Sequence, residues 1–457
     1  MDVPNAWKGS IESLSQEGLG IGTMITKVDG KDVRRPIFIP FTVPGDEVEA
    51  DITEQKRKYT FGMLSKITTP SPLRAEPECP HFTVCGGCNL QHVAYDEQLL
   101  QKGAQISFLL SRKGVKLPHD VKVLPAKQRR NYRRRAKVAM QFTGGRLNAG
   151  FRKFHAHDII PVSKCLIVAP EIEAFISLLN RSESRVGMTG SFTQEAVVVV
   201  GDNRKAGILV PLDDTPQQQR KAVRDFFEDL YSRNRKLIGN LFFEENRVTR
   251  TSGQVQEHIT YKAAGLTFSF LPETFIQSNI ATNETLIATA IGFLSNDGDI
   301  KKETVLDMYA GLGNISLPAA KVGKHVVAVE GHEASVLLGR INAYQNGIEN
   351  TTFIHRSAEK YIYEYIKNRR AGTVTEEYPV ADRIVIDPPR TGCTPEVLRG
   401  LLMTGIKRIV YISCNPVTLA GDLAKLGESY DIKDIIAIDM FPDISHVETI
   451  VRLDLRK

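Results

Sequence analysis

The sequence feature that most constrains the fold is a set of short apolar runs, rich in β-branched residues, in the C-terminal third of the chain. They lie at residues 304–309, 325–330, 383–386 and 408–413. Runs of this kind are typical of buried strands in the parallel sheet of an open α/β fold. Such folds bind ligands at the carboxyl ends of their strands, so we expect the functional site at the turns that follow these runs.

The turn after the first run carries two glycines. Ala310-Gly311-Leu312-Gly313-Asn314 leads into a predicted helix, and the next strand ends at Glu330. In nucleotide-binding α/β units the glycines allow close backbone approach, and the acid accepts ribose hydroxyls. Ser316 replaces the third glycine of a dinucleotide motif, and Asp307 puts a carboxylate near the turn. These features favour S-adenosylmethionine over NAD, because a carboxylate suits a cationic amino acid better than a pyrophosphate.

A cysteine follows the last of the four runs. Asn415-Pro416 stops the strand directly after Cys414, which leaves the thiol in a turn rather than in the core. A lone cysteine at such a place is usually a buried structural residue. Here the run at 383–386 ends on the same edge in the acidic turn Asp387-Pro388-Pro389-Arg390. The sequence therefore predicts a thiol, a carboxylate and a methyl-donor site side by side.

This combination suits methylation of carbon 5 of uracil. Carbon 5 is a poor nucleophile, but a thiolate that adds to carbon 6 creates an enolate that is nucleophilic at carbon 5. A base must then remove the carbon 5 proton so that the thiol can leave. Cys414 is the candidate nucleophile, Asp387 the polar group beside the enolate, and Glu448, at the start of an apolar run, the candidate base.

Four further cysteines are candidate metal ligands. Cys79, Cys85 and Cys88 lie within ten residues on a loop rich in proline and glycine, and Cys165 lies far along the chain. The glycines allow the loop to fold tightly, so that the thiols converge on one centre. Four sulfur ligands suit an iron–sulfur cluster or a structural zinc ion, which the spacing does not separate. The alternative is a redox pair, but the βαβ context of thioredoxin-like sites is missing.

The N-terminal part reads as a small β-barrel. Residues 9–69 alternate short β-type runs with turns, and we expect hairpins at Val28-Asp29-Gly30-Lys31 and at Val43-Pro44-Gly45-Asp46. Small barrels of the oligonucleotide-binding kind hold nucleic acid, and the basic turn at 56–59 would suit a phosphate backbone. A solvated surface turn is the alternative.

Residues 129–140 form the densest basic stretch. If this stretch is a strand, Arg133, Arg135 and Lys137 share one face and the apolar residues turn the other way. Such a stripe fits a phosphate track or, equally, a solvated edge strand. The formal net charge of +6 is compatible with a polyanionic partner.

The sequence also limits where the protein is expected to act. Apolar runs of membrane-spanning length are absent, and the N-terminus lacks the pattern of a secretion signal. Six cysteines in 457 residues are too few for a disulfide scaffold, and cytosolic thiols stay reduced. We therefore expect a cytoplasmic protein that does not associate with a membrane and has no obligate protein partner.

Taken together, the motifs resemble the RNA 5-methyluridine methyltransferase family, in its iron–sulfur, TRAM-domain branch. The resemblance covers nearly the whole chain and rests on Cys79-x5-Cys85-Gly86-Gly87-Cys88 with Asn89-Leu90-Gln91-His92, on Asp387-Pro388-Pro389-Arg390, on Ser413-Cys414-Asn415-Pro416 and on His446-Val447-Glu448. It implies an α/β protein of three domains. These are an OB-like TRAM barrel that binds RNA (1–70), a central α+β iron–sulfur domain with a basic RNA-binding strand (71–270), and a Rossmann-like class I methyltransferase domain (271–457). The helix near 95–114 is expected to pack on the last of them.

The same resemblance implies the activity and the site residues. It implies S-adenosylmethionine-dependent methylation of carbon 5 of one uridine, with 23S ribosomal RNA as the expected substrate and the T loop of transfer RNA as the alternative. Cys414 would be the nucleophile and Glu448 the base. A [4Fe-4S] cluster would bind Cys79, Cys85, Cys88 and Cys165. The expected donor contacts are Gln277, Tyr309, Asn314, Glu330, Ser357 and Asp387.

Two other functions are weighed against this one. Cytosine-5 RNA methyltransferases also attack carbon 6 with a thiol, but they tend to carry a cysteine directly after the proline of the acidic turn, where this chain has Pro389-Arg390. The second alternative is a non-catalytic iron–sulfur protein that binds RNA. Replacing Cys414 with alanine distinguishes an enzyme from a binding module, because a binding module should keep its function without this thiol.

Overall fold

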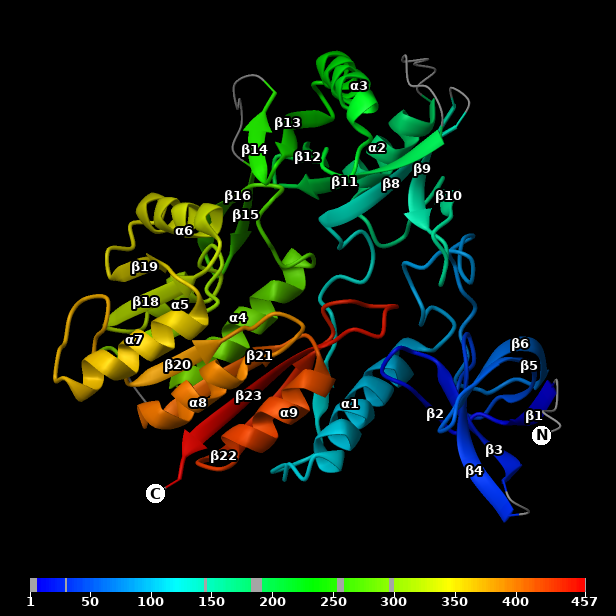
Figure 1. The fold of residues 1–457 in the computed structure, drawn as a ribbon, viewed down its shortest axis with the longest axis horizontal. Coiled ribbons are helices and arrows are strands. Elements are labelled where there is room, and N and C mark those ends of the chain that lie inside the picture. The colour runs from blue at the N-terminus through cyan, green and yellow to red at the C-terminus, as the bar shows by residue number, and fades with distance from the viewer. Residues whose placement is uncertain are drawn as a thin grey trace.

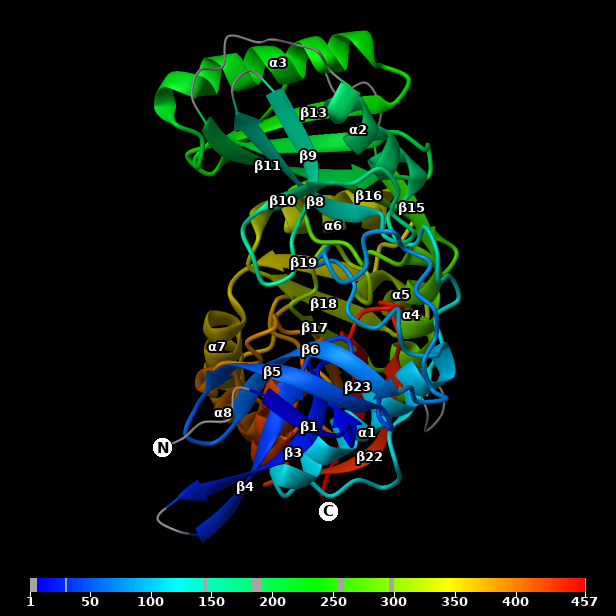
Figure 2. The same cartoon turned by 90° about the vertical axis from the view of Figure 1, so that its right-hand side faces the viewer.

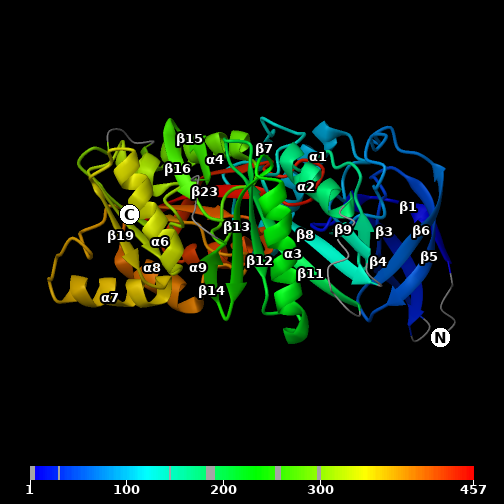
Figure 3. The same cartoon turned by 90° about the horizontal axis from the view of Figure 1, so that it is seen from above.

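The computed structural model describes residues 6–28, 31–143, 146–181, 191–252, 259–295 and 300–456. Within these ranges the strands form sheets of six, seven, two and eight strands. Figure 1 shows the six-stranded sheet (β1–β6) at one side, the seven-stranded sheet (β8–β14) above, and the large sheet with its helices below. Figure 2 shows the seven-stranded sheet with α2 and α3 stacked above the rest, and Figure 3 shows the first sheet at one end of an elongated molecule.

The N-terminal sheet has the order β1-β5-β6-β4-β3-β2. Its strands are β1 (Ala6–Ser10), β2 (Ser13–Leu14), β3 (Gly20–Val28), β4 (Lys31–Ile39), β5 (Glu47–Gln55) and β6 (Thr60–Thr69). The first predicted hairpin is confirmed, because β3 and β4 pair from Gly20 and Ile39 to Val28 and Lys31. Its turn residues, Asp29 and Gly30, lie outside the described residues.

The second predicted hairpin, at residues 43–46, is wrong. β6 lies between β4 and β5, so the turn connects two strands that are not neighbours. The reason is the Asp46 carboxylate, which accepts the N–H groups of Val43 (2.7 Å) and Ser71 (2.8 Å) and the Arg74 guanidinium (2.5 Å). The turn is therefore tied to the segment after the barrel instead of closing a hairpin.

The central sheet has the order β10-β9-β8-β11-β12-β13-β14. Its strands are β8 (Arg135–Thr143), β9 (Arg146–Arg152), β10 (Ile159–Pro161), β11 (Ser191–Val200), β12 (Ala206–Pro211), β13 (Ile238–Glu245) and β14 (Val248–Thr251). Two amphipathic helices, α2 (Pro170–Arg181) and α3 (Arg220–Arg233), bury their apolar faces in the same hydrophobic cluster as the strands; the short 3₁₀ turn η1 (Gln217–Gln219) precedes α3.

The predicted alternation along the basic stretch is confirmed for its apolar face and interrupted on its basic face. Ala136, Val138 and Met140 are buried in the central core, as expected of period two. Arg133 precedes β8 and lines the pocket of the four cysteines, and Arg135 donates to the Pro272 carbonyl (2.6 Å). These two arginines serve internal contacts while Lys137 stays exposed, so the phosphate track stays a prediction; the edge-strand alternative is wrong, because β8 lies between β9 and β11.

The large sheet contains the predicted α/β core. Its order is β19-β18-β17-β20-β21-β23-β22-β7, and β19, β18, β17, β20 and β21 run parallel. The strands are β7 (Lys122–Leu124), β17 (Thr304–Met308), β18 (His325–Glu330), β19 (Thr351–His355), β20 (Arg383–Ile386), β21 (Arg408–Ser413), β22 (Tyr430–Ile438) and β23 (Glu448–Leu455). The four predicted strands are all present, and β23 adds an antiparallel neighbour to β21.

Helices cover both faces of this sheet. One face packs against α4 (Ile280–Ser295), α5 (Ser316–Ala320) and α6 (Glu333–Gln345). The other packs against α1 (Tyr95–Arg112), α7 (Ala358–Arg370), α8 (Pro395–Thr404) and α9 (Pro416–Leu426). Buried neighbours along β17, such as Val305 and Leu306, alternate between the two clusters. The sequence prediction of an α/β fold is confirmed.

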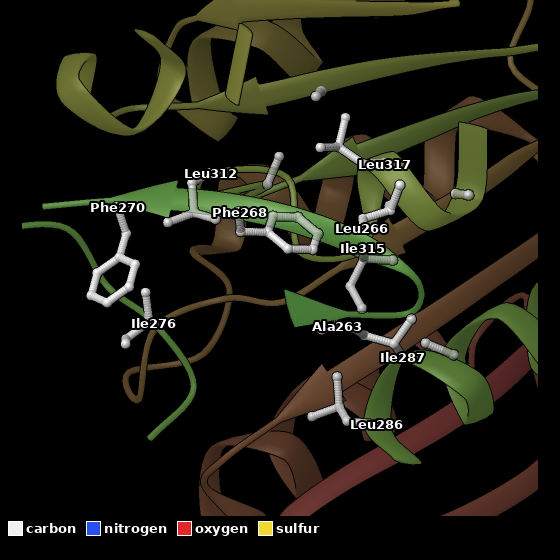
Figure 4. Packing of buried hydrophobic residues seen from close by; sticks show 14 of the residues in the cluster. Ala263, Leu266, Phe268, Phe270, Ile276, Leu286, Ile287, Leu312, Ile315 and Leu317 are labelled. Carbon is white, nitrogen blue, oxygen red and sulfur yellow. The ribbon is translucent and has the colours of Figure 1, made fainter. Parts of the chain in front are cut away.

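Two segments from the middle of the chain join this core. The hairpin of β15 (Ile259–Ala263) and β16 (Leu266–Phe270) buries side chains against the start of α5 and against α4, as Figure 4 shows for Phe268, Leu317 and Leu286. β7 extends the large sheet beside β22, and α1 packs against β7 and α9. The parts of the chain are therefore interleaved at their interfaces. Among the described residues no helix is both long and apolar enough to cross a membrane.

Candidate active site

The ends of four strands meet at one edge of the large sheet. Met308 at the end of β17 pairs with Val329 of β18 and with Ile386 of β20, and Ile386 pairs with Tyr411 of β21. The residues that follow these strands are therefore neighbours in space, although they come from segments more than 100 residues apart. This is the edge at which open α/β sheets bind ligands.

Strand pairing places the candidate nucleophile opposite the candidate base. Ser413 of β21 pairs with Thr449 of the antiparallel β23. One step further along each strand brings Cys414 across from Glu448. Cys414 is half-buried, whereas Glu448 is only 4% exposed. The sequence identified both residues, but the pairing that joins them depends on a strand from the C-terminus.

Burial and charge set the protonation of this pair. Burial, with the carboxylates of Glu448 and Asp387, raises the pKa of the Cys414 thiol to about 11. Burial, together with Asp387, raises the pKa of Glu448 well above its ordinary value. Burial and the charge of Asp307 raise the pKa of Asp387 to about 7. At neutral pH the free protein therefore holds a protonated thiol beside a carboxyl group that is a strong base once ionised.

Arg390 is a charged neighbour of the site whose role the sequence did not indicate. Its positive charge lowers the pKa values of Cys414 and Glu448, against the effect of burial. Its main-chain carbonyl accepts the Asn415 side-chain amide (2.9 Å) and the Thr418 hydroxyl (3.2 Å). The acidic turn and the thiol turn are thus joined directly. Its position in the motif Asp387-Pro388-Pro389-Arg390 was the available signal.

The N-terminal barrel also reaches the thiol turn. Asn415 caps α9, where its side-chain oxygen accepts the Val417 N–H (3.1 Å) and the Gln16 side-chain amide (3.0 Å). The pocket beside Cys414 is lined by residues of three parts of the chain, which include Leu14, Gln16, Gly18, Lys102, Cys414 and His446. Gln16 and Asn415 are 399 residues apart, so no local pattern could have indicated this contact.

Three of the predicted donor residues are hydrogen-bonded to other groups of the protein. The Glu330 carboxylate accepts the N–H groups of Gly311 (2.9 Å) and His332 (2.7 Å). Asn314 exchanges amide hydrogen bonds with Asn283 (2.7 and 3.0 Å). Ser357 caps α7 by accepting the Lys360 N–H (3.3 Å). These three side chains are held in place by the protein itself.

Three observations fit a cationic donor in this place. The Gln277 side chain is 5% exposed, and its oxygen is buried without a hydrogen-bond partner among the described residues. Gly311 has φ +57°, and beyond its chain neighbours no described atom lies within 4 Å of a Cβ built there. Tyr309 holds φ +65°, which is rare for a non-glycine residue and is found at functional turns. A buried acceptor that lacks a partner suits a donor such as an ammonium or a ribose hydroxyl.

Asp307, predicted near the donor, has its carboxylate buried and bonded to the protein itself. It is 1% exposed and accepts a hydrogen bond from the Ser316 hydroxyl (2.5 Å). Burial raises its pKa to about 7. Asp307 thus ties β17 to the start of α5, which explains why a serine stands where a dinucleotide motif has its third glycine.

The four predicted ligand cysteines come together in one pocket. Cys79, Cys85, Cys88 and Cys165 line it with Arg133, and the Cys85 sulfur accepts the Gly87 N–H (3.4 Å). Burial raises the pKa values of Cys85, Cys165 and Cys88, the last to about 12. Among the described residues, no group of three or more His, Cys, Asp or Glu side chains is gathered around a single ion position.

Comparison with known families gives two matches. The model of the tRNA (uracil-5-)-methyltransferase family matches residues 94–456. The model of the TRAM domain of tRNA (uracil(54)-C(5))-methyltransferase matches residues 7–73. Together the two models span nearly the whole chain.

Individual relatives agree with these matches. The chain is 32% identical to the 23S rRNA (uracil(1939)-C(5))-methyltransferase RlmD of Pectobacterium atrosepticum, over 96% of this chain and 92% of the relative. It is 33% identical to the corresponding enzyme of Vibrio campbellii, over 96% and 94%. The crystal structure of Pyrococcus abyssi tRNA (uracil-54, C5)-methyltransferase in complex with S-adenosyl-L-homocysteine aligns with a TM-score of 0.69 at 23% identity, over 98% of this chain and 100% of that one.

Proposed function

The chain belongs to the tRNA (uracil-5-)-methyltransferase family, an enzyme family that methylates carbon 5 of uracil in RNA, and from this premise we propose that its substrate is one uridine of 23S ribosomal RNA. Relatives with that named activity match 96% of the chain at about one-third identity. Transfer RNA is the second candidate, because the family model and the aligned crystal structure carry that name. The observation that carries the reaction is the position of Cys414, directly after β21, next to Glu448 at the start of the neighbouring strand β23.

In the proposed mechanism the Cys414 sulfur bonds to carbon 6 of the target uracil, and the electrons of the C5–C6 double bond move toward the carbonyl as an enolate. S-adenosylmethionine, which Gln277, Tyr309, Asn314, Glu330, Ser357 and Asp387 would hold, would supply the methyl group to carbon 5 and leave as the neutral thioether S-adenosylhomocysteine. Glu448 then takes the proton from carbon 5, the double bond re-forms, and the sulfur–carbon bond breaks to release the thiolate.

Burial and neighbouring charges suit Cys414, Glu448 and Asp387 to different steps of this reaction. The thiol must lose its proton before attack, and Arg390 is the charge that favours the thiolate among carboxylates that oppose it. Glu448 is buried, which raises its proton affinity and so favours uptake of the carbon 5 proton. Asp387, close to both, is suited to the positive charge of the donor.

We propose that the four-cysteine pocket holds a [4Fe-4S] cluster on Cys79, Cys85, Cys88 and Cys165. The donor set fits, because four thiols line one pocket beside the positive charge of Arg133. Around one zinc ion, with bonds of about 2.3 Å, the sulfurs would be gathered about 3.8 Å apart. A cluster binds each thiolate through a different iron and so spaces the sulfurs more widely.

We propose that RNA is held by the TRAM barrel of the first 70 residues and by the central part (71–270), with catalysis in residues 271–457. The barrel lies beside the thiol through the contact of Gln16 with Asn415. Tyr59, the exposed aromatic residue of the basic turn, contacts the partly buried rings of Phe38 and Phe61, and such a group suits stacked bases. A cytoplasmic location follows from ribosomal RNA as the substrate.

Trapping with 5-fluorouridine RNA tests the proposal. Fluorine at carbon 5 cannot leave as a cation, so the methylated adduct should stay bonded to Cys414 and resist denaturation. Peptide mapping should find the RNA on residue 414, and 23S RNA from cells without the protein should lack one 5-methyluridine. An adduct elsewhere, or unchanged ribosomal RNA with loss in transfer RNA, would contradict the nucleophile or the substrate respectively. Anaerobically prepared protein should contain iron and sulfide, and zinc in their place would contradict the cluster.

A further inference from the structure

The strand that carries Glu448 is approached through a long connection. Residues 439–447 link β22 to β23 and end directly at the proposed base. Their main chain bonds to other parts of the molecule. The Pro442 carbonyl accepts the Tyr132 hydroxyl (3.1 Å), and the Met440 carbonyl accepts the Asn279 side-chain amide (3.3 Å). The position of the base therefore depends on groups outside its own sheet.

The strongest of these contacts comes from the cysteine loop. The N–H groups of Asn89 (3.2 Å) and Leu90 (3.0 Å) both donate to the Asp443 carbonyl. The Asn89 side-chain oxygen accepts the Ser445 N–H (2.9 Å), and its nitrogen donates to the Ser445 hydroxyl (3.0 Å). Four hydrogen bonds thus join two residues of the cysteine loop to Asp443 and Ser445, five and three residues before Glu448.

Asn89 lies at the junction of three parts of the chain. It follows Cys88 directly, and the Cys88 side chain lines the four-cysteine pocket. Its side-chain nitrogen also donates to the Glu17 carbonyl (2.6 Å) in the loop of the N-terminal barrel that borders the Cys414 pocket. A shift of the cysteine loop would therefore be passed on to the segment before the base.

The backbone at Asp443 is held in an uncommon conformation. Its φ is +66°, in the left-handed region that favours glycine. Its N–H donates to the Gln98 side-chain oxygen (3.0 Å), and its carboxylate accepts the Gln98 amide (3.1 Å) and the Arg130 guanidinium (2.5 Å). A residue persists in this region only where its surroundings hold it. The Asn89 and Leu90 bonds to its carbonyl belong to that support.

We propose that Asn89 is a positioning residue for the proton-removal step: it fixes the cysteine loop to residues 443–445 and so places Glu448 against carbon 5 of the base bonded to Cys414. The inference rests on the proposed function. Cys414 is positioned separately, by β21 and by the Asn415 cap of α9. Loss of Asn89 should therefore slow the last step more than the first.

The two steps are separable, because the enzyme is bonded to RNA between them. If proton removal is slowed, unmodified uridine RNA and S-adenosylmethionine should accumulate a methylated adduct that resists denaturation. We expect Asn89→Ala to prolong the lifetime of this adduct by about 10- to 100-fold, as misplacement of a catalytic group does. The rate of adduct formation should change less than about threefold, or about 0.6 kcal/mol, because Cys414 is positioned by other contacts.

Asn180→Ala is the matched control. The Asn180 side chain also bridges a main-chain N–H and carbonyl, both of Ala149, in the central part of the molecule and away from residues 439–448. It should lower stability without adduct accumulation. Glu448→Gln should accumulate the adduct most strongly. If the wild-type protein forms neither product nor adduct, the proposed function fails, whatever Asn89 does.

Two results would overturn the positioning role itself. One is an Asn89→Ala protein with wild-type adduct lifetime. The other is equal loss of adduct formation and decay, as in a protein that is merely less stable. Should Asn89→Ala not fold, Asn89→Asp carries the test, because it keeps the acceptor for the Ser445 N–H and loses the two side-chain donor bonds. It should prolong the adduct by a smaller factor, and an unchanged lifetime would again overturn the role.

Discussion

The candidate active site has a donor half, which would bind S-adenosylmethionine, and a thiol half around Cys414, and these two halves are built in different ways. The centre of the donor half, from Asp307 to Glu330, comes from one continuous strand-turn-helix-strand segment, and Gln277, Ser357 and Asp387 add to it from outside that segment. The thiol half brings together Gln16, Asn89, Cys414 and Glu448, through contacts that span up to 399 residues. The difference teaches that a local motif can specify where a donor binds, whereas the reactive geometry depends on how distant parts of the chain dock.

The largest effect is expected when the Cys414 thiol is removed, because this change should affect the thiol half and leave the donor half intact. Cys414→Ala should abolish methyl transfer, by at least about 10⁴-fold, because no other group can bond to carbon 6. S-adenosylmethionine should still bind with wild-type affinity, since the donor half is untouched. Methyl transfer and equilibrium binding of the donor measure the two. Asn180→Ala is the control, because the Asn180 side chain bonds to the main chain of Ala149 in the central part of the molecule. Loss of donor binding in Cys414→Ala would show that the halves are not independent.

The next effect concerns the docking that builds the thiol half. The Lys102 ammonium on α1 donates to the Asp439 carboxylate (2.7 Å), and both side chains are almost fully buried (3% and 0% exposed). Lys102→Met should lower the free energy of unfolding by about 3–5 kcal/mol, because it leaves a buried carboxylate uncompensated. Denaturant unfolding measures this loss.

The paired variant sharpens that result. Lys102→Met with Asp439→Asn removes both charges and should recover much of the lost stability, since no unpaired ion stays buried. Lys8→Met, which breaks an exposed ion pair with Glu49 on the N-terminal sheet, should change the stability by less than about 1 kcal/mol. A single Lys102→Met variant as stable as the wild type would show that this buried pair does not secure α1 to residues 439–441.

A smaller effect tests the charge beside the thiol. Arg390 lowers the pKa of Cys414, which burial and two carboxylates raise to about 11. Arg390→Gln removes the stabilising positive charge, so the pKa should rise further and the thiolate fraction at any pH below it should fall. We expect alkylation of Cys414 at pH 8–9 to slow roughly threefold to tenfold, corresponding to about half to one pKa unit.

The pH dependence identifies the cause. In the wild type, the alkylation rate should rise with pH up to about 11, and in Arg390→Gln the same curve should be displaced to higher pH. Arg399→Gln, which removes an exposed guanidinium paired with Glu396 on α8, is the control and should leave the curve in place. A displacement to lower pH would contradict the assigned effect of Arg390.

The same division separates what the sequence predicted from what it missed. The strands of the α/β core, the helix of residues 95–112 and the first hairpin were predicted because periodicity and turn chemistry are local. The hairpin at 43–46 was predicted wrongly because the Asp46 carboxylate bonds to the distant Ser71, and the position of Arg133 in the pocket of the four cysteines was missed because it depends on distant segments. A glutamate that starts a strand is usually exposed, and the burial of Glu448 depends on residues 439–447, whose contacts no local pattern encodes.

The smallest expected effect concerns the barrel contact. The Gln16 amide donates to the Asn415 side-chain oxygen, which also caps α9 next to Cys414. Gln16→Ala removes one partly exposed hydrogen bond, worth about 0.5–1 kcal/mol, and should lower kcat/KM for RNA about twofold to fivefold without changing donor binding. Lys56→Ala, on the basic turn of the same barrel, is the control for RNA contact alone and should reduce the salt dependence of RNA binding. If Gln16→Ala altered only that salt dependence, the barrel would act on RNA alone and would not help to order the turn that holds Cys414.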